Sequence, residues 1–317
     1  MARRMETGGG IGSFIERIRT TETYHSNKKI KKLFRGIALF AGALGLDLVF
    51  SRGAFAWGPA VHTVIACNIL EQAAAILPAV AEIIRAYPLE YVYGNLAADF
   101  FVGKGQKKKE GHSHNWETGY RCLEEAEDDR EASYAYGFIS HLAADVVAHN
   151  YFVPNLLCQG STWKRMGHLY WEARADHRMG GMYIRLAREI LTMEHLGCDQ
   201  MLISAVGKRR NGLKTRRRIY TQSVKFSDYL YGVPSSFLEM GARYRVSDQY
   251  LGFTIGLAYR LVRDVLTNPD TSPCLSYDPI GSKNLTIAGR HLFRNRWLQL
   301  ERPKSPFFPV DEELLDV

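Results

Sequence analysis

The chain has 317 residues, of which 46% are hydrophobic and 23% are charged. A chain of this length and apolar content can bury a full core, which excludes an intrinsically disordered body. The formal net charge of +8 is concentrated near the amino end, so it does not mark the whole chain as a nucleic-acid-binding protein.

The first 56 residues have the composition of a secretory signal with an extended amino-terminal region. A basic cluster at 28–35 precedes the apolar run GIALFAGALGLDLVF, and Ala54 and Ala56 match the small residues that signal peptidase accepts. The apolar run has 15 residues and includes Asp47, whereas a membrane-spanning helix needs about 20 apolar residues. We therefore expect cleavage after Ala56 and an exported protein, periplasmic or secreted, which would stay anchored in the membrane if uncut.

Cleavage would change both the charge and the amino terminus. Residues 1–56 carry ten Lys and Arg residues and four acidic residues, so the remaining chain has a net charge of about +2. Trp57 would become the first residue, and a free α-amino group can bind a metal ion once it loses its proton. The segment 208–218, KRRNGLKTRRR, is basic at seven of eleven positions. We interpret it as a solvated loop or helix face, with attraction to anionic lipid or another polyanion as the alternative.

The cysteines do not define a metal or disulfide framework. They are scattered and include no C-x-x-C pair, which excludes a zinc ribbon. An odd number leaves at least one thiol unpaired within the chain. The five are Cys67, Cys122, Cys158, Cys198 and Cys274.

Apolar residues recur every three or four positions after residue 57, which predicts an all-α multi-helix bundle. Helices are expected in 61–87, with a break near Pro78, and in 131–152, 163–193 and 246–268. We also expect a solvated connection or helix start at 124–131, a polar linker near 205–220 and a loop-rich tail after Asn268. Residues 57–317 should form a single domain, with the metal site in 57–176 and a helical part of unknown role in 177–317.

Histidine spacing indicates a metal site. His141 and Asp145 are four residues apart, so on a helix they share a face, and His149 continues the series with a displacement of about 40°. His168 and Glu172 repeat the arrangement further along the chain. Imidazole and carboxylate ligands without a nearby cysteine favour zinc. The alternative is that both pairs are buried hydrogen bonds that stabilise a core.

The order of these residues resembles a known family. A tryptophan at the expected new amino terminus is followed by His62, Asp99, a histidine of the HSHNW segment, H-x-x-x-D, another histidine and H-x-x-x-E. This order is similar to that of the zinc-dependent phospholipase C family and the related fungal single-strand nucleases, from Trp57 to about Glu172. The resemblance implies a helical bundle of that type and a zinc-dependent phosphoric ester hydrolase.

The resemblance also implies up to three zinc ions per chain. Asp145 would be shared by the first two ions, and either His112 or, as we favour, His114 would serve the second. The implied ligands are Trp57 (amino nitrogen and carbonyl), His62 and Asp145 for the first ion, Asp99, His114 or His112, His141 and Asp145 for the second, and His149, His168 and Glu172 for the third.

Two features depart from the family pattern. Only Val146, Val147 and Ala148 separate Asp145 from His149, where family members usually have a longer spacer, so the third site is the most divergent. In addition, WGPAVH at 57–62 is closer to the start of the nucleases than to that of the bacterial phospholipases.

The chemistry that the resemblance implies is hydrolysis of a phosphate ester by a zinc-activated hydroxide, with Asp145 as a shared ligand and Asp99 as a ligand or an alternative general base. Phospholipid is the first expected substrate, with peripheral membrane contact, and a nucleic-acid strand is the alternative. A non-catalytic, exported metal-binding scaffold is the third possibility. Aromatic residues near the ligands could hold a choline head group or stack on bases, although aromatic residues near a helical core usually just pack. These are Tyr91, Tyr93, Trp116, Tyr151, Phe152 and Trp171.

Overall fold

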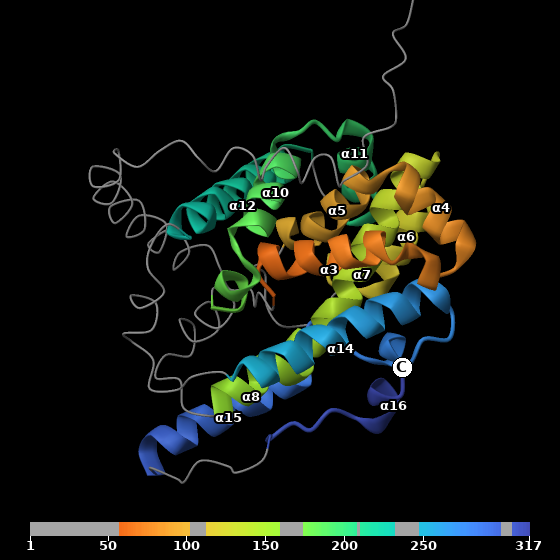
Figure 1. Cartoon of the computed structure of the whole chain (residues 1–317). Coiled ribbons are helices and arrows are strands. Elements are labelled where there is room, and N and C mark those ends of the chain that lie inside the picture. The colour runs from red at the N-terminus through yellow and green to blue at the C-terminus, as the bar shows by residue number, and fades with distance from the viewer. Residues whose placement is uncertain (1–56, 102–111, 159–173, 208–209, 232–246, 299–305) are drawn as a thin grey trace, which may run out of the picture.

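The computed structural model describes residues 57–101, 112–158, 174–207, 210–231, 247–298 and 306–317. Every regular element within these ranges is a helix, so the predicted all-α multi-helix fold is confirmed for the part of the chain that the structure describes (Figure 1). The expected leader, residues 1–56, lies outside the described residues, and its cleavage stays a prediction.

The helices form an amino-terminal and a carboxy-terminal group. The first group is α3 (Pro59–Glu71), η2 (Ala73–Ala75), α4 (Pro78–Ala86), α5 (Pro88–Ala97), the 3-10 turn η3 (Ala98–Phe101), α6 (Trp116–Glu124), α7 (Asp129–Val147), the π-helical turn η4 (Ala148–Phe152) and α8 (Val153–Cys158). Residues 174–179 are also helical. The second group is α10 (Gly181–Thr192), α11 (Leu196–Ala205), α12 (Arg210–Leu230), α14 (Asp248–Thr267), η5 (Pro273–Ser276), α15 (Ser282–Leu298) and α16 (Glu312–Leu315).

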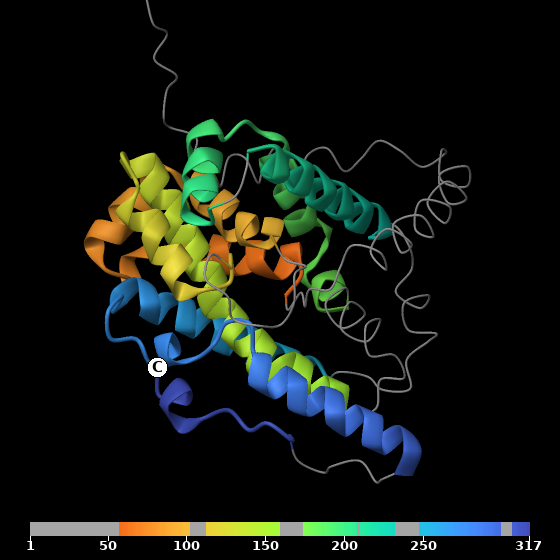
Figure 2. The ribbon, with the colours of Figure 1, turned by 180° about the vertical axis from the view of Figure 1, so that it is seen from behind.

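Helix α7 is the centre of the bundle. It packs against α5, α6 and α14, and every residue from Gly137 to Val147 is buried, as expected for a helix covered on all sides. Helices α10, α11 and α12 lie on one side of it, and α14, α15 and α16 lie on the other (Figures 1 and 2). The core that surrounds α7 therefore includes residues from both groups.

Glycines on both helices make the crossing of α5 and α7 very close. A Cβ at Gly94 would overlap the carbonyl oxygen of Tyr134, and a Cβ at Gly137 would overlap the carbonyl oxygen of Tyr91. Helices with larger side chains at the contact keep their axes about 8–10 Å apart. The two glycines therefore allow the backbones to touch, which places the end of α5 beside the second half of α7.

Several predicted boundaries are confirmed. The break near Pro78 separates α3 from α4, and Pro78 is the first residue of α4, where its missing N–H is not needed. The acidic stretch 124–131 contains the end of α6 and the start of α7, where the side chain of Asp128 accepts a hydrogen bond from the Glu131 N–H at 2.8 Å. The helix predicted over 246–268 is α14.

The predicted polar linker near 205–220 is wrong, because α12 begins at Arg210 and continues to Leu230. Its apolar side chains recur at helical spacing, and Leu213, Tyr220 and Val224 are buried. The interpretation as a linker gave too much weight to the basic residues, which can lie on the solvent face of an amphipathic helix.

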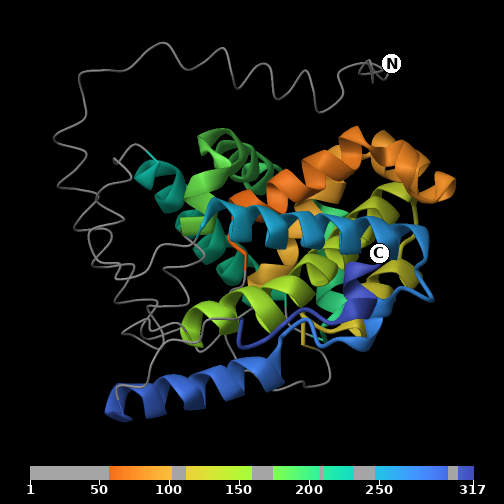
Figure 3. The same cartoon turned by 60° about the horizontal axis from the view of Figure 1, so that its bottom comes forward.

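The predicted loop-rich tail after Asn268 is also wrong for much of its length. Helix α15 lies near the carboxy-terminal end of the chain and packs beside α8 (Figure 3). Leu285 and Ala288 of α15 are buried. Basic and amide side chains interrupt the apolar positions of this segment, which hid its helical pattern in the sequence. Residues 299–305 lie outside the described residues.

All five cysteines are buried and unpaired. Burial raises the pKa of the Cys67 thiol to about 12, so this group stays protonated at neutral pH. Among the residues that the structure describes, no helix has both the length and the apolar character that crossing a membrane requires.

Replacement of Gly137 by alanine tests the close helix crossing. We expect Gly137→Ala to lower the free energy of unfolding by about 1–3 kcal/mol, because the new Cβ must push the α5 backbone away. Gly256→Ala on α14 is the matched control, since a Cβ there meets open space and a helix gains about 1 kcal/mol from the change. Urea denaturation of both variants measures the difference, and equal stability of the two would contradict the close crossing.

Candidate metal centre

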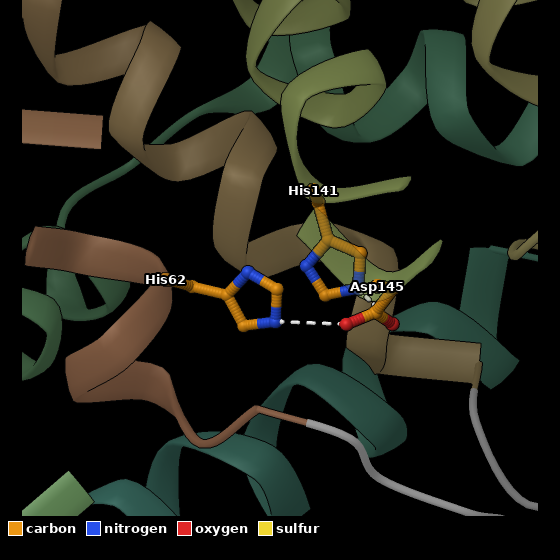
Figure 4. Close-up of side chains that lie close together, drawn as sticks. All are labelled: His62, His141 and Asp145. Carbon is orange, nitrogen blue, oxygen red and sulfur yellow. Dashed lines mark ion pairs between the residues drawn. The ribbon is translucent and has the colours of Figure 1, made fainter. Parts of the chain in front are cut away.

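Six buried side chains converge beside the second half of α7. Their exposed fractions range from 0 to 6%. Figure 4 shows three of them, from α3 and α7, whose rings and carboxylate lie close together. The His/Asp cluster consists of His62 on α3, Asp99 on η3, His114 before α6, His141 and Asp145 on α7, and His149 on η4.

Asp145 is the common partner of the four imidazoles. Its Oδ1 lies 3.3 Å from Nε2 of His62. Its Oδ2 lies 3.3 Å from Nε2 of His114, 3.2 Å from Nε2 of His141 and 3.5 Å from Nε2 of His149. The two oxygens thus face different halves of the cluster, as a carboxylate shared between two cations would.

Asp99 completes the half that contains His114 and His141. Its Oδ1 lies 3.4 Å from Nε2 of His114 and 3.7 Å from Nε2 of His141. The two Nε2 atoms are themselves 3.1 Å apart. The buried hydroxyl of Tyr220, on α12, donates a hydrogen bond to Oδ2 of Asp99 at 3.4 Å. One carboxylate oxygen therefore faces the cluster, and the other is held from outside it.

Hydrogen bonds on the outer side of the rings decide which nitrogens face the cluster. Nδ1 of His141 lies 2.7 Å from the carbonyl oxygen of Asn95, which can only accept, so Nδ1 carries the hydrogen and Nε2 has its lone pair free. Nδ1 of His114 lies 3.2 Å from the Ser113 hydroxyl. His112 belongs to neither of the groups whose ligand atoms lie close together, and its Nδ1 accepts the backbone N–H of His114 at 3.1 Å.

Burial and the neighbouring charges shift the pKa values of the cluster in opposite directions. Burial raises the pKa of Asp145, but the charges of His141 and His149 and the hydrogen bonds from His114 and His141 together hold the pKa well below its usual value. For His114 burial lowers the pKa, and hydrogen bonds to Asp145 and Asp99 raise it to about 9. Burial and the neighbouring His62 lower the pKa of His141. The site therefore holds ionised carboxylates and attracts positive charge, which a proton on His114 or a metal cation can supply.

The residues fit a metal ion. Ligand atoms of His62, His141 and Asp145 lie within 4.8 Å of one another, and so do those of Asp99, His114 and His141. Both ring nitrogens of His62 and Oδ1 of Asp145 are buried without a hydrogen-bond partner. Unpaired buried polar atoms cost free energy, and a cation between them would remove that cost. Neutral imidazoles and carboxylates are a ligand set that zinc accepts.

Trp57 lies next to the cluster. Its buried indole donates a hydrogen bond from Nε1 to the carbonyl oxygen of Ala144 at 3.1 Å, and its ring lies 4.5 Å from that of Phe152. Ala144 is the neighbour of Asp145, so the start of α3 is attached to α7 at the shared carboxylate. The proposed use of the Trp57 backbone as a ligand stays a prediction.

A π-helical turn holds His149. Pro154 lacks an N–H for the carbonyl oxygen of Asn150, four residues earlier, and Nδ2 of Asn284 on α15 donates to that oxygen at 2.9 Å. The Asn150 side chain donates in turn to the carbonyl oxygens of Val146 and Asp278, each at 2.9 Å. The carboxy-terminal region thus stabilises the turn that positions His149.

Other predicted residues either lie outside the described residues or make contacts away from the cluster. His168 and Glu172, the other implied ligands of the third ion, lie outside the described residues, as does Trp171. Trp116 is half-buried, and its Nε1 donates to the carbonyl oxygen of Tyr277 at 2.9 Å. The remaining aromatic candidates are buried in the core, where their faces are not open to a ligand; these are Tyr91, Tyr93, Tyr151 and Phe152.

A family model described as zinc-dependent phospholipase C matches residues 61–220, which is 160 of the 317 residues. The chain belongs to this family. No curated protein and no solved structure matches it. The matched range contains all six members of the His/Asp cluster, so the zinc-dependent phospholipase C family accounts for the types of residue in the centre.

Three further residues support the site, and the sequence pattern did not indicate them. Asn95 orients His141, Tyr220 binds Asp99, and Asp176 binds the start of α3 through the N–H groups of Ala60 and Val61. Asn95 acts through its backbone carbonyl oxygen, so its residue type carries no signal for this contact. The contacts of Tyr220 and Asp176 join segments more than 110 residues apart, and spacing within one helix cannot reveal them.

Zinc affinity should depend on pH. A ligand histidine must be deprotonated to bind a metal, and His114 in the metal-free protein has a pKa of about 9. Zinc therefore competes with a proton at neutral pH, and the affinity should rise by about tenfold per pH unit from pH 7 to 8. Competition with a chromophoric chelator at several pH values measures the slope, and a flat profile would contradict this assignment.

His112→Asn provides the control for this experiment. The asparagine oxygen can accept the N–H of His114 in place of Nδ1 of His112, so the pH slope should remain. His114→Asn removes the titrating ligand and should lower the affinity at every pH.

Proposed function

We propose that this chain is an exported, zinc-dependent phosphodiesterase that hydrolyses the head-group phosphate ester of a phospholipid. The observation that carries the proposal is the shared carboxylate of Asp145, whose two oxygens face two halves of a buried ligand set within a zinc-dependent phospholipase C domain. Such a centre can bind two cations side by side on a transferring phosphate group.

The residues divide into two adjacent ligand sets and a third. His62 and Asp145, with the backbone of Trp57 once the leader is cut, would hold the first ion. Asp99, His114 and His141 with Asp145 would hold the second. His149, His168 and Glu172 are the proposed ligands of a third ion. When bound, zinc supplies a Lewis acid that lowers the pKa of a coordinated water to about 7 and neutralises charge on phosphate oxygens.

The protein itself contributes orientation and proton binding. The carbonyl oxygen of Asn95 keeps the hydrogen of His141 on Nδ1, and the Tyr220 hydroxyl keeps one oxygen of Asp99 away from the cluster. The other oxygen of Asp99 is then able to accept a proton from a water molecule or to bind a cation. Burial excludes bulk water from the cluster, so each of these electrostatic interactions acts in a medium of low dielectric constant.

Phospholipid is favoured over nucleic acid by the family and by the charge of one surface helix. The exposed face of α12 carries Lys214, Arg218 and Lys225, which lie at i, i+4 and i+11 and hence on one stripe. The nearby Ile219 is 58% exposed. A basic stripe beside an exposed apolar side chain suits the surface of an anionic bilayer. The buried aromatic residues leave little support for an aromatic cage around choline.

Two other functions remain as outcomes of experiment. A single-strand nuclease of related chemistry would use the same ligands on a nucleic-acid phosphate. A non-catalytic exported scaffold would bind metal without hydrolysis. Hydrolysis of a phosphocholine ester and of single-stranded DNA by the same preparation separates the three.

Replacement of the shared carboxylate tests the proposed centre. We expect Asp145→Asn to lose at least one equivalent of zinc and to lower phosphodiester hydrolysis by 100-fold or more, as one carboxylate serves both ligand sets. Elemental analysis of chelator-free protein should give about three zinc ions per wild-type chain. A ratio near two would remove the third site from the proposal, and a ratio below one would contradict the catalytic function and leave a scaffold that has lost its metal sites.

Asp199→Asn is the control for a hydrogen-bonded carboxylate outside the cluster, whose side chain is 17% exposed. Asp199 accepts hydrogen bonds from Tyr93 and Arg217 away from the cluster, so its loss should lower stability without changing the zinc ratio. Circular dichroism of both variants checks that they remain helical.

The basic stripe of α12 can be tested separately from the chemistry. Substitution of Lys214, Arg218 and Lys225 by serine should weaken binding to vesicles with anionic lipid by on the order of a hundredfold, at about 1 kcal/mol per basic residue. Hydrolysis of a water-soluble phosphodiester should stay unchanged. The control replaces three exposed basic residues elsewhere and keeps the same charge change, namely Arg85, Lys283 and Arg290. Equal vesicle binding of the two triple variants would show that general charge, and not this stripe, is responsible.

A further inference from the structure

Helix α3 begins without a capping residue of its own. Gly58 is the N-cap and has no side chain, and Pro59 follows it at the first helical position. The next two backbone N–H groups, of Ala60 and Val61, are the ones that a capping Ser, Asp or Asn would normally satisfy. In this chain they need another acceptor because α3 starts inside the protein, where Trp57, Ala60 and Val61 are all buried.

Asp176, in the helical residues 174–179, supplies that acceptor. Its Oδ2 accepts the N–H of Ala60 at 3.2 Å, and its Oδ1 accepts the N–H of Val61 at 3.0 Å. The side chain is buried, with 4% of the residue exposed. A carboxylate at a helix amino terminus also interacts favourably with the helix dipole. Asp176 thus caps a helix that begins 117 residues earlier in the sequence.

Gly58 makes room for this long-range cap. The three atoms nearest to a Cβ at Gly58 all belong to the carboxylate of Asp176, and they would overlap with it. The backbone of Gly58 has φ −78° and ψ 171°, which any residue can adopt, so the glycine is needed for space and not for its conformation. Asp176 therefore caps α3 in place of a side chain at position 58.

The capped turn carries a member of the His/Asp cluster. The N–H of His62 donates to the carbonyl oxygen of Gly58 at 3.2 Å, which closes the first turn of α3, and Nε2 of His62 lies 3.3 Å from Asp145. On the other side of the turn, Trp57 is bonded to Ala144. Any fraying of this turn would move His62 and Trp57 together, because both are attached to it.

Asp176 is itself held in place. The hydroxyl of Tyr231 donates a hydrogen bond to the backbone carbonyl oxygen of Asp176. Its carboxylate makes both of its hydrogen bonds to backbone N–H groups of α3, and it belongs to neither of the groups of residues that could hold a metal ion. The carboxylate of Asp176 therefore orients the first turn of α3 and does not act as a metal ligand in this arrangement.

We propose that Asp176 is a positioning residue of the metal centre, which acts as the N-cap of α3 in place of Gly58 and so fixes His62 and Trp57 against Asp145. The expected effect on zinc binding rests on the proposed metal centre. The capping of α3 by Asp176 does not depend on that centre.

The test moves the cap from one residue to the other. Asp176→Ala should weaken zinc binding by about tenfold, the usual effect of removing a group that orients a metal ligand. It should also increase hydrogen exchange in residues 58–66 while the rest of the bundle stays protected. The double variant Gly58→Asp with Asp176→Ala places a carboxylate at the local cap position, in the space that Asp176 has left, and should restore both properties.

Gly58→Asp alone is the matched control. It brings two carboxylates into the same space, so it should impair zinc binding and protection more than Asp176→Ala does. Asp176→Asn keeps one acceptor oxygen and should give an intermediate result, which serves if Asp176→Ala does not fold. The full chain is expressed in an exporting host, and zinc is titrated against a chelator on the purified protein.

The outcomes separate this inference from the proposed function. Unchanged zinc binding and unchanged exchange in Asp176→Ala would overturn the inference alone. Loss of zinc that the double variant does not restore would also overturn it, because Asp176 would then contact the ion itself. A wild-type protein that binds no zinc would refute the proposed function, and the exchange measurement would still decide whether Asp176 caps α3.

Discussion

The structure around the site depends on one buried charge. The carboxylate of Asp145 is 1% exposed, and an ionised carboxylate in such a place requires several partners. Four imidazoles from α3, the segment before α6, α7 and η4 surround it. Each of these segments must be placed to within a fraction of an ångström for the rings to meet one side chain. The packing of the bundle can be understood as the means of bringing those four segments together.

Each segment is fixed by a contact that lies outside the cluster. Gly94 and Gly137 let α5 approach α7, which puts the carbonyl oxygen of Asn95 within 2.7 Å of His141. Tyr220 reaches Asp99 from α12, and Asn284 reaches η4 from α15. The carboxy-terminal region, whose sequence suggested no chemistry, therefore holds Asp99 and the π-helical turn in place through hydrogen bonds. Outer contacts of this kind determine which ring nitrogen is free and how much a ligand can move.

The sequence predicted the parts of this arrangement that are local. His141 and Asp145 share a helix face because they are four residues apart, and the same periodicity predicted the helical fold. Spacing could not decide between His112 and His114, since both precede α6 in an irregular segment. Their roles follow from tertiary contacts: His114 faces Asp145, and His112 accepts a backbone N–H. The error over α12 has a similar origin. Its apolar residues recur at helical spacing but are interrupted by basic ones, and the packing of α12 against α10 and η3 shows which of its sides is buried.

The same distinction explains the short spacer before His149. Only three residues separate Asp145 on α7 from His149 at the start of η4, so the two side chains lie on one face of the continuing helix, and Nε2 of His149 lies 3.5 Å from Oδ2 of Asp145. The helix then widens into the π-helical turn η4, and Pro154 prevents an immediate return to regular hydrogen bonding at Asn150. Asn284 compensates for the lost bond. The short spacer thus keeps His149, near the start of the π-helical turn, beside the shared carboxylate.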